Sequence, residues 1–318
     1  MFPEPKNRQV MSCRTNIEEA ASKGEIVEAI AQSCDAAHNL IVDLVSMKGI
    51  IPRCEGAIGI SEGTVRDIAL ISRVGKPVCF LIDGFTTDAH GERIALLSRR
   101  KAQLMCQEHY ISKLSAGDVV EAKVTHLENF GAFCDIGCGC VALLPIDAIS
   151  VSRISHPNDR FVCGDNIKAV IKSITGGRIT LSMKELLGSW QQNADCFCTG
   201  ETVSGVVRSV EDYGVFVELA PNLAGLAELR PDVYAGQKTS VYIKSILPDK
   251  MKVKLIIIDA FFSDSDRLPI KYFIDSGHID TWRYSPTQCE RTISTVFKQK
   301  HFTSHKKRFI MLKNERDV

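Results

Sequence analysis

The chain contains an internal repeat, and this repeat constrains its fold more than any other feature of the sequence. The segment "GDVVEAKVTHLENFGAFCDIG" from Gly117 aligns without a gap with "GETVSGVVRSVEDYGVFVELA" from Gly200, 83 residues later. Further along, "GDNIKAVIKSI" from Gly164 matches "GQKTSVYIKSI" from Gly236. Self-similarity of this kind indicates one small structural unit that is used more than once.

Each copy consists of about five short runs rich in Val, Ile and Phe, separated by Gly, Asn, Asp and Pro. This pattern is typical of a small five-stranded antiparallel barrel of the oligonucleotide/oligosaccharide-binding (OB) type. A weaker copy begins at Gly24 and continues with "GKPVCFLID" from Gly75, but Ala37 and Leu40 replace its aromatic residues. We therefore expect an all-β-dominated chain of three tandem OB-fold barrels, the first degenerate, with short linking helices and a C-terminal tail.

The same patterns divide the chain into seven segments. These are an N-terminal tail (1–19), the degenerate barrel (20–97), a linker helix (98–114), the second barrel (115–188), a linker (189–199), the third barrel (200–260) and a C-terminal extension with a basic tail (261–318). Ser98 can cap the linker helix. A shorter helix in "MKELLGSW" is expected to stop at Gly188, and "SVSRISHPNDRF" reads as a long loop with a helical turn.

Composition bounds the possible partners. The chain has 39 Lys and Arg against 38 Asp and Glu, so its net charge is +1 and bulk charge does not favour nucleic-acid binding. Basic residues gather only in "KQKHFTSHKKRFIMLKNER", which either binds RNA electrostatically or only solubilises the chain. There is no apolar run of membrane-spanning length and no secretory signal pattern, so we expect a cytoplasmic chain with no membrane partner. Its 12 cysteines are then expected to be reduced thiols.

The second strand of each later copy predicts an exposed aromatic side chain. Side chains on a strand alternate between two faces, so Phe133 shares a face with Asp135, and Phe216 shares one with Glu218. Because a charge is almost never buried unpaired, we expect the carboxylates to mark the solvent face. Phe133 and Phe216 should then be exposed or half-exposed on that face.

A second aromatic residue lies three positions earlier and is out of phase with the first. It is Phe130 in one copy and Tyr213 in the other, each followed directly by a glycine, Gly131 or Gly214. A β-bulge at the glycine would turn it onto the solvent face. Two such aromatics would form a platform on which unpaired bases stack, each worth about 1–3 kcal/mol. The alternative is that they only cover a hydrophobic core.

On these residues the later copies resemble the S1 RNA-binding domain family. The matching elements are "GDVVEAKVTHLENFGAFCDIG", "SRISHPNDRFVCGDNIKAVIKSI" and "GRITLSMKEL". The whole chain is similar to a group of short S1-like ribosomal proteins of clostridial-type bacteria, whose divergent first copy ends in an "SRRKAQ"-like helix.

The resemblance implies that the chain binds single-stranded RNA or mRNA without strict sequence preference, in translation or RNA turnover. It implies RNA contacts by the aromatic pairs and by a basic residue that opens the last strand: Phe130 with Phe133, Tyr213 with Phe216, and Arg178, Lys252 or Lys254. In the family a histidine of the third strand often contributes as well, but this chain has Pro145 and Glu228 near that place.

Three further residues are candidates. His156, in "SHPNDR", either contacts RNA or orders the loop before Pro157. Arg160 and Arg208 are plausible phosphate contacts, although lone arginines are often only solvated.

The close cysteines of "CDIGCGC" (Cys134, Cys138, Cys140) and "CFC" (Cys196, Cys198) raise the question of a metal site. Zinc sites usually pair cysteines two to four residues apart, and a C-x-C spacing is tight for chelation, so we expect no metal and no cofactor.

The chain has no P-loop, no zinc-protease motif and no nucleophile elbow. We therefore expect no catalysis and no small-molecule substrate. The preferred hypothesis is a non-catalytic RNA-binding protein that acts in translation on the small ribosomal subunit. The rivals are a regulator of RNA decay or transcription and a protein–protein scaffold.

Overall fold

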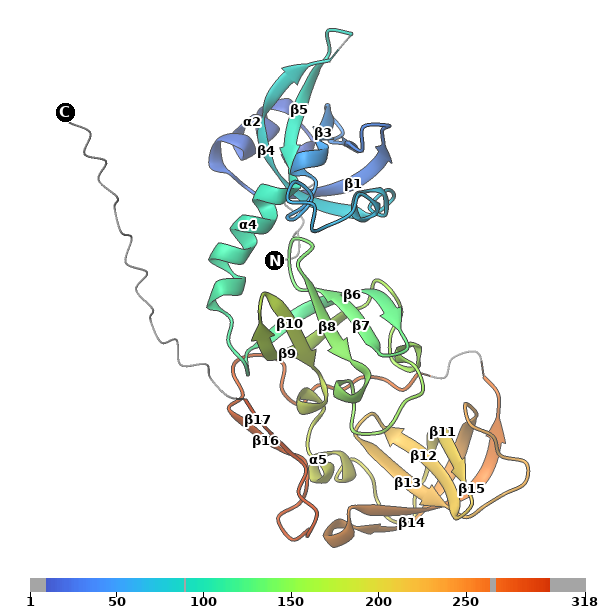
Figure 1. Cartoon of the computed structure of the whole chain (residues 1–318). Helices are drawn as coiled ribbons and strands as arrows, with labels where there is room; N and C mark the ends of the chain where they lie inside the picture. Colours follow the sequence, from blue (N-terminus) through green and yellow to red (C-terminus); the bar gives the residue numbers. More distant parts are fainter. Residues whose placement is uncertain (1–9, 89, 264–266, 298–318) are drawn as a thin grey trace, which may run out of the picture.

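The computed structural model describes residues 10–88, 90–263 and 267–297. Figure 1 shows three barrels following one another along the molecule, with a helix between the first and the second. The basic run from Lys298 onward lies outside the described residues. Among those that are described, no helix has the length and hydropathy needed to cross a membrane.

Each barrel is a closed sheet of five strands. The first barrel consists of β1 (Val27–Cys34), β2 (Leu40–Asp43), β3 (Lys48–Ile51), β4 (Pro77–Thr87) and β5 (Arg93–Ser98). The second consists of β6 (Val119–Glu128), β7 (Gly131–Asp135), β8 (Val141–Pro145), β9 (Asn166–Thr175) and β10 (Arg178–Ser182). The third consists of β11 (Thr202–Glu211), β12 (Gly214–Ala220), β13 (Leu223–Ala227), β14 (Lys238–Leu247) and β15 (Lys252–Phe261). The expectation of three tandem OB-like barrels is confirmed.

The pairing corrects the expectation in one respect, because the barrels are not wholly antiparallel. The third and fifth strands of each barrel run parallel: β3 with β5, β8 with β10, and β13 with β15. The registers of the second and third barrels agree with the sequence repeat. Phe133 lies opposite Leu143, and Phe216 lies opposite Leu226, so the offset of 83 residues holds across both strands.

The inward phase of the second strands is as predicted. Ala132, Cys134 and Ile136 are fully buried, and Val215 and Val217 are fully buried in the third barrel. Small and branched side chains pointing inward fill the narrow barrel, because a five-stranded barrel has room only for side chains.

Short helices lie before, within and between the barrels. They are α2 (Arg14–Lys23), η1 (Arg53–Glu55), α3 (Ile68–Ile71), α4 (Arg99–His109), η2 (Ile111–Lys113), η3 (Ile146–Ala148), η4 (Pro157–Asp159), η5 (Lys184–Leu187), α5 (Trp190–Ala194) and η6 (Pro248–Lys250). Ser98 caps α4, its hydroxyl accepting from the Lys101 amide at 2.9 Å. The segment "MKELLGSW" holds the 3₁₀ helix η5, which stops at Gly188 with φ 81°. The loop 150–161 contains the expected helical turn, η4.

The C-terminal strap, as we call residues 267–297, packs on both the second and the third barrel. The strap contains a two-stranded sheet of β16 (Thr281–Arg283) and β17 (Ser294–Val296). The hydroxyl of Tyr272 accepts from the Lys168 amide of the second barrel at 3.0 Å. The hydroxyl of Tyr284 donates to the Asn222 carbonyl of the third at 2.6 Å. The sequence analysis assigned these residues only to a C-terminal extension.

Truncation of Trp282 in the strap should destabilise the unit formed by the second and third barrels. Trp282 is only 7% exposed and belongs to the core of the third barrel. Trp282→Ala should lower the free energy of unfolding by about 3–5 kcal/mol, as is typical of a truncated buried aromatic. Urea unfolding followed by circular dichroism measures it. Tyr234→Ala, at a site 58% exposed, is the control, and equal effects of the two variants would contradict the packing role.

Candidate nucleic-acid interface

The outer aromatic residues lie in hairpin turns, not in the strands. Glu128 pairs with Gly131, so only Asn129 and Phe130 form the turn between β6 and β7. In the third barrel Asp212 and Tyr213 form the same two-residue turn. The bulge that we expected at the glycines is absent from both hairpins, and Phe130 and Tyr213 reach the outer face from the turn itself.

The register shift of each hairpin lies on the partner strand. It falls between Val124 and His126 on β6, and between Val207 and Ser209 on β11. The glycine after the turn is needed for a different reason, because a Cβ at Gly131 would lie 2.4 Å from the Leu144 carbonyl oxygen. The hairpin thus approaches the next strand more closely than a side chain would allow.

The two aromatic platforms have the same geometry. The rings of Phe130 and Phe133 stand edge to face, with centroids 6.0 Å apart and an interplanar angle of 88°. Tyr213 and Phe216 show the same 6.0 Å and 88°. Phe130 is 56% exposed and Tyr213 70% exposed, whereas the two phenylalanines in the strands are half-buried. Half-burial fixes the inner ring, and the outer residue is exposed to solvent.

Basic residues lie beside each platform on the same outer face. Lys254 pairs with Leu226, which pairs with Phe216, so these side chains form one row across the third barrel. Lys252 lies two residues earlier on β15 and therefore on the same face. Both lysines are exposed.

In the second barrel the place of Lys254 is taken by Thr180, which pairs with Leu143 beside Phe133. Arg178, exposed and two residues before Thr180, takes the place of Lys252. The placement agrees with the sequence expectation for all three basic residues.

The sequence analysis missed His126 as part of the platform of the second barrel. Its exposed ring stacks on Phe133, with centroids 6.4 Å apart and an interplanar angle of 23°. His126 pairs with Phe133 across the hairpin. A prediction of the two-residue turn together with the register shift on β6 would have indicated that these two residues are neighbours. The third barrel has Ser209 in the equivalent place.

Glu218 overturns the argument that carboxylates mark the solvent face. Its side chain is fully buried between the second and third barrels and is paired with Arg160 and Arg208. Arg208 donates through Nε to Glu218 Oε2 at 2.6 Å, and Arg160 donates to Oε1. The reasoning failed because a buried charge is tolerated when it is paired.

Arg160 and Arg208 therefore do not lie on an open RNA surface. Arg160 is only 3% exposed, and burial lowers its pKa, against the attraction of Glu218. The side chain of Arg208 is 11% exposed and also lies 3.7 Å from Asp159. Both arginines are paired with Glu218 between the barrels. We therefore correct the expectation that they contact phosphate.

His156 orders its own loop. Its Nδ1 accepts from the Asn158 amide at 3.0 Å, and the Asp159 carboxylate accepts from the His156 amide at 3.3 Å. The two bonds form a capping box for η4. Of the two roles left open by the sequence, the structure shows the ordering role.

The first barrel has no aromatic platform. Pairing of β1 with β2 places Ile41 opposite Ser33, the position that Phe133 holds opposite His126. The sequence alignment assigned Leu40 to that place, but Leu40 is fully buried in the core. The loop of the first hairpin is longer, and this shifts the alignment by one residue.

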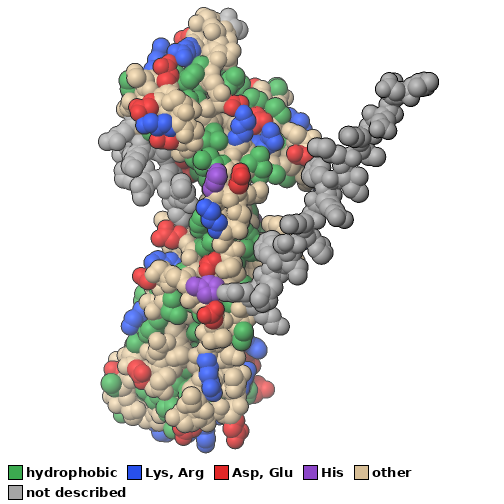
Figure 2. Space-filling view, turned by 90° about the vertical axis from the view of Figure 1, so that its left-hand side faces the viewer, with side chains coloured by type: hydrophobic (Ala, Val, Ile, Leu, Met, Phe, Trp, Pro, Cys, Tyr) green, Lys and Arg blue, Asp and Glu red, His purple; other side chains and the backbone are tan. Residues whose placement is uncertain are grey.

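Charge on the surface is mixed. Figure 2 shows lysines and arginines interspersed with aspartates and glutamates over the face that it presents, in keeping with the net charge of +1.

The platform of the second barrel lies within a segment that matches a known family. Residues 113–184 match the family model described as S1 RNA binding domain. These residues form an S1 RNA-binding domain. The chain is 31% identical to the small ribosomal subunit protein bS1 of Leuconostoc lactis over 231 residues, covering 68% of this chain and 52% of that protein.

Further proteins are similar to parts of this chain. The bS1 homolog of Bacillus subtilis is 27% identical over 268 residues, covering 81% of this chain and 66% of that protein. GSP13 of the same species has a solution structure that is 26% identical and covers 23% of this chain and 57% of its own, with a TM-score of 0.22. The chain spans about half the length of the Leuconostoc relative.

Removing the charge of Glu218 should weaken the junction of the two barrels. Glu218→Gln removes the carboxylate paired with both buried guanidinium groups and leaves only Asp159, 3.7 Å from Arg208, as a nearby counter-charge. The free energy of unfolding should fall by about 3–5 kcal/mol, as when one partner of a buried ion pair is removed. Urea unfolding gives the value. Glu228→Gln, at an exposed carboxylate, should change it by less than about 0.5 kcal/mol; if both variants match the wild type, the pairing does not stabilise the junction.

Proposed function

We propose that the chain binds single-stranded RNA by stacking unpaired bases on the two aromatic platforms. The observation that carries the proposal is the repeated geometry, 6.0 Å and 88° in both barrels. Every base has a π-face, so such stacking tolerates any sequence. An aromatic pair that only covered a core would not expose its outer ring by more than half.

Phosphate contacts add a smaller share of the affinity. Arg178 lies beside the platform of the second barrel, and Lys252 and Lys254 lie beside the platform of the third barrel, on the same face as the rings. Few contacts of this kind predict a moderate salt dependence, because the slope follows the number of phosphates neutralised. On the face shown in Figure 2 positive and negative side chains are mixed, in keeping with the net charge of +1.

The junction between the barrels supports simultaneous use of both platforms. Glu218 with its two arginines and the C-terminal strap hold the second and third barrels together. Binding of one strand at the first platform then raises its effective concentration at the second. A single strand bound at both sites would be held more tightly than either site alone allows.

The setting that we propose is translation on the small ribosomal subunit, in the cytoplasm and without catalysis. It is supported by the S1 RNA-binding domain and by similarity to proteins named small ribosomal subunit protein bS1. The first barrel, which lacks a platform, would contribute contacts other than base stacking.

Removal of the inner ring of each platform should weaken RNA binding. Phe133→Ala and Phe216→Ala should each reduce the binding free energy for a single-stranded RNA by about 1–3 kcal/mol. Fluorescence anisotropy with a labelled oligonucleotide, at one fixed salt concentration, measures the loss.

The matched control is Phe262→Ala, an aromatic 70% exposed after the far end of β15, which should leave the affinity unchanged. Wild-type affinity of the Phe133→Ala, Phe216→Ala double variant would refute the platforms. No binding of RNA by the wild type would favour the protein-scaffold reading instead.

Association with small ribosomal subunits tests the setting separately from the binding itself. The wild type should sediment with isolated small subunits, and the double variant should do so less. A wild type that binds RNA but stays in the supernatant would place the chain in RNA decay or transcription.

A further inference from the structure

Four cysteines from three elements meet between the first two barrels. Cys79 lies on β4, Cys106 lies on α4, and Cys138 and Cys140 lie in the turn between β7 and β8. Cys79, Cys106 and Cys138 form one buried cluster, with exposures of 7%, 5% and 3%, and Cys140 packs against it. The RNA platforms do not use these residues.

The backbone of the β7–β8 turn holds Cys138 in an unfavourable conformation. Cys138 has φ 53°, in the left-handed region that a residue with a side chain seldom adopts. The carboxylate of Asp135 accepts from the amides of Gly137 and Gly139 at 2.8 Å and 3.0 Å and fixes the turn around it. Such a residue persists only when its surroundings hold it there, and such positions cluster at functional sites.

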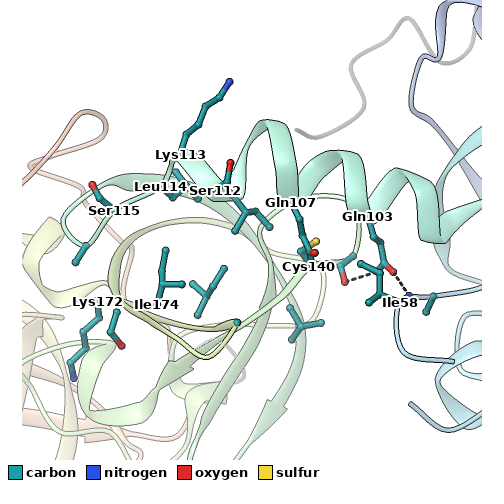
Figure 3. Close-up of a pocket in the computed structure, with 18 of the residues that line it drawn as sticks. Ile58, Gln103, Gln107, Ser112, Lys113, Leu114, Ser115, Cys140, Lys172 and Ile174 are labelled. Atoms are coloured by element: carbon teal, nitrogen blue, oxygen red, sulfur yellow. Dashed lines mark hydrogen bonds between the residues drawn. The ribbon is translucent and has the colours of Figure 1, made fainter. Parts of the chain in front are cut away.

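Helix α4 and the turn are also tied together beside the cluster. The amide of Gln103 donates to the Gly139 carbonyl at 3.4 Å, and its oxygen accepts from the Ile58 amide at 3.0 Å, as Figure 3 shows. A Cβ at Gly139 would lie 2.4 Å from Arg99 Nη2, so glycine is needed for the turn to approach the helix.

The contacts among the thiols favour the ionised form of Cys106. Hydrogen bonds from the thiols of Cys138 and then Cys140 lower the pKa of Cys106, and the same bonds raise the pKa of Cys138 and of Cys140. The thiolate is the nucleophilic form of cysteine. Cys106 and Cys138 share one buried cluster although they come from different elements, so we take Cys106 as the attacking group and Cys138 as the thiol that reacts next.

A pocket of about 1490 Å³ reaches the edge of the cluster at Cys140. Cys140 lines it together with Gln103, Gln107 and Arg99, and Figure 3 places Cys140 next to the two glutamines. A hydroperoxide such as hydrogen peroxide is close to water in size and can enter.

We propose that Cys106 and Cys138 form a reversible disulfide in response to hydrogen peroxide, linking α4 to the second barrel. The Cys106 thiolate attacks one peroxide oxygen, the O–O bond breaks, and the departing hydroxide takes a proton to become water. The resulting sulfenic acid is attacked by the Cys138 sulfur, which forms the S–S bond and releases a second water. Two thiols are oxidised and one peroxide is reduced, and a dithiol such as dithiothreitol reverses the change.

The bond would fix the first barrel to the second. Because α4 follows β5 directly at Ser98, a link from the middle of α4 to the β7–β8 turn removes rotation between the two barrels. Phe130 and Phe133 lie in the segment between the two cysteines, but the disulfide is detected on the thiols alone, so its test is independent of RNA binding.

Peptide mapping of the purified full chain after brief peroxide treatment tests the proposal. Intact mass should fall by two hydrogens, one Cys106–Cys138 cross-linked peptide should appear, and dithiothreitol should remove both changes. Cys138→Ser should abolish that peptide, and Cys163→Ser, at an exposed cysteine, should leave it unchanged.

Three results would overturn the proposal. They are twelve alkylated thiols after treatment, a cross-link that excludes Cys106, and zinc bound to the thiols of the purified chain. Within the described residues no group of three side chains is placed to hold a metal. If Cys138→Ser fails to fold by circular dichroism, Cys106→Ser replaces it, with the same expected loss of the cross-link.

Discussion

The arrangement of the second and third barrels depends on one buried carboxylate. Glu218 lies on the outer face of β12, the face that also carries Phe216, yet it is fully buried because Arg160 of the second barrel and Arg208 cover it. An unpaired charge there would cost several kcal/mol. The junction of the second and third barrels is therefore stable only when Glu218 contacts both arginines. The pairing therefore selects one orientation of the two barrels.

Around this pairing the junction is completed by neutral hydrogen bonds. Asn222 is fully buried, and its amide donates to the carbonyls of Lys184 at 2.8 Å and Gly188 at 2.9 Å. The Val151 amide donates to its oxygen at 3.0 Å. With the C-terminal strap, these bonds satisfy the polar groups that the junction takes out of water, and both platforms are held on one body.

Each platform depends on a smaller constraint, the two-residue turn. A turn of that length places Phe130 next to the first strand residue, Gly131, and fixes which residues of β6 and β7 face each other. The third barrel uses the same turn and reaches the same ring geometry with Tyr213. The first barrel has a longer loop and no platform, although its five strands close in the same order. The fold can therefore be kept without the site.

The sequence alone determined the repeat, the three barrels, the inward phase of β7 and β12, the cap at Ser98 and the identity of the aromatic pairs. These follow from local patterns, since alternation and turn residues act within a few positions. Only the tertiary structure decided where Glu218, Arg160 and Arg208 belong. Strand phase tells which face a charge is on, but not whether another barrel covers that face. Pairing across 58 residues, from Arg160 to Glu218, is a contact between domains, and no local pattern encodes it.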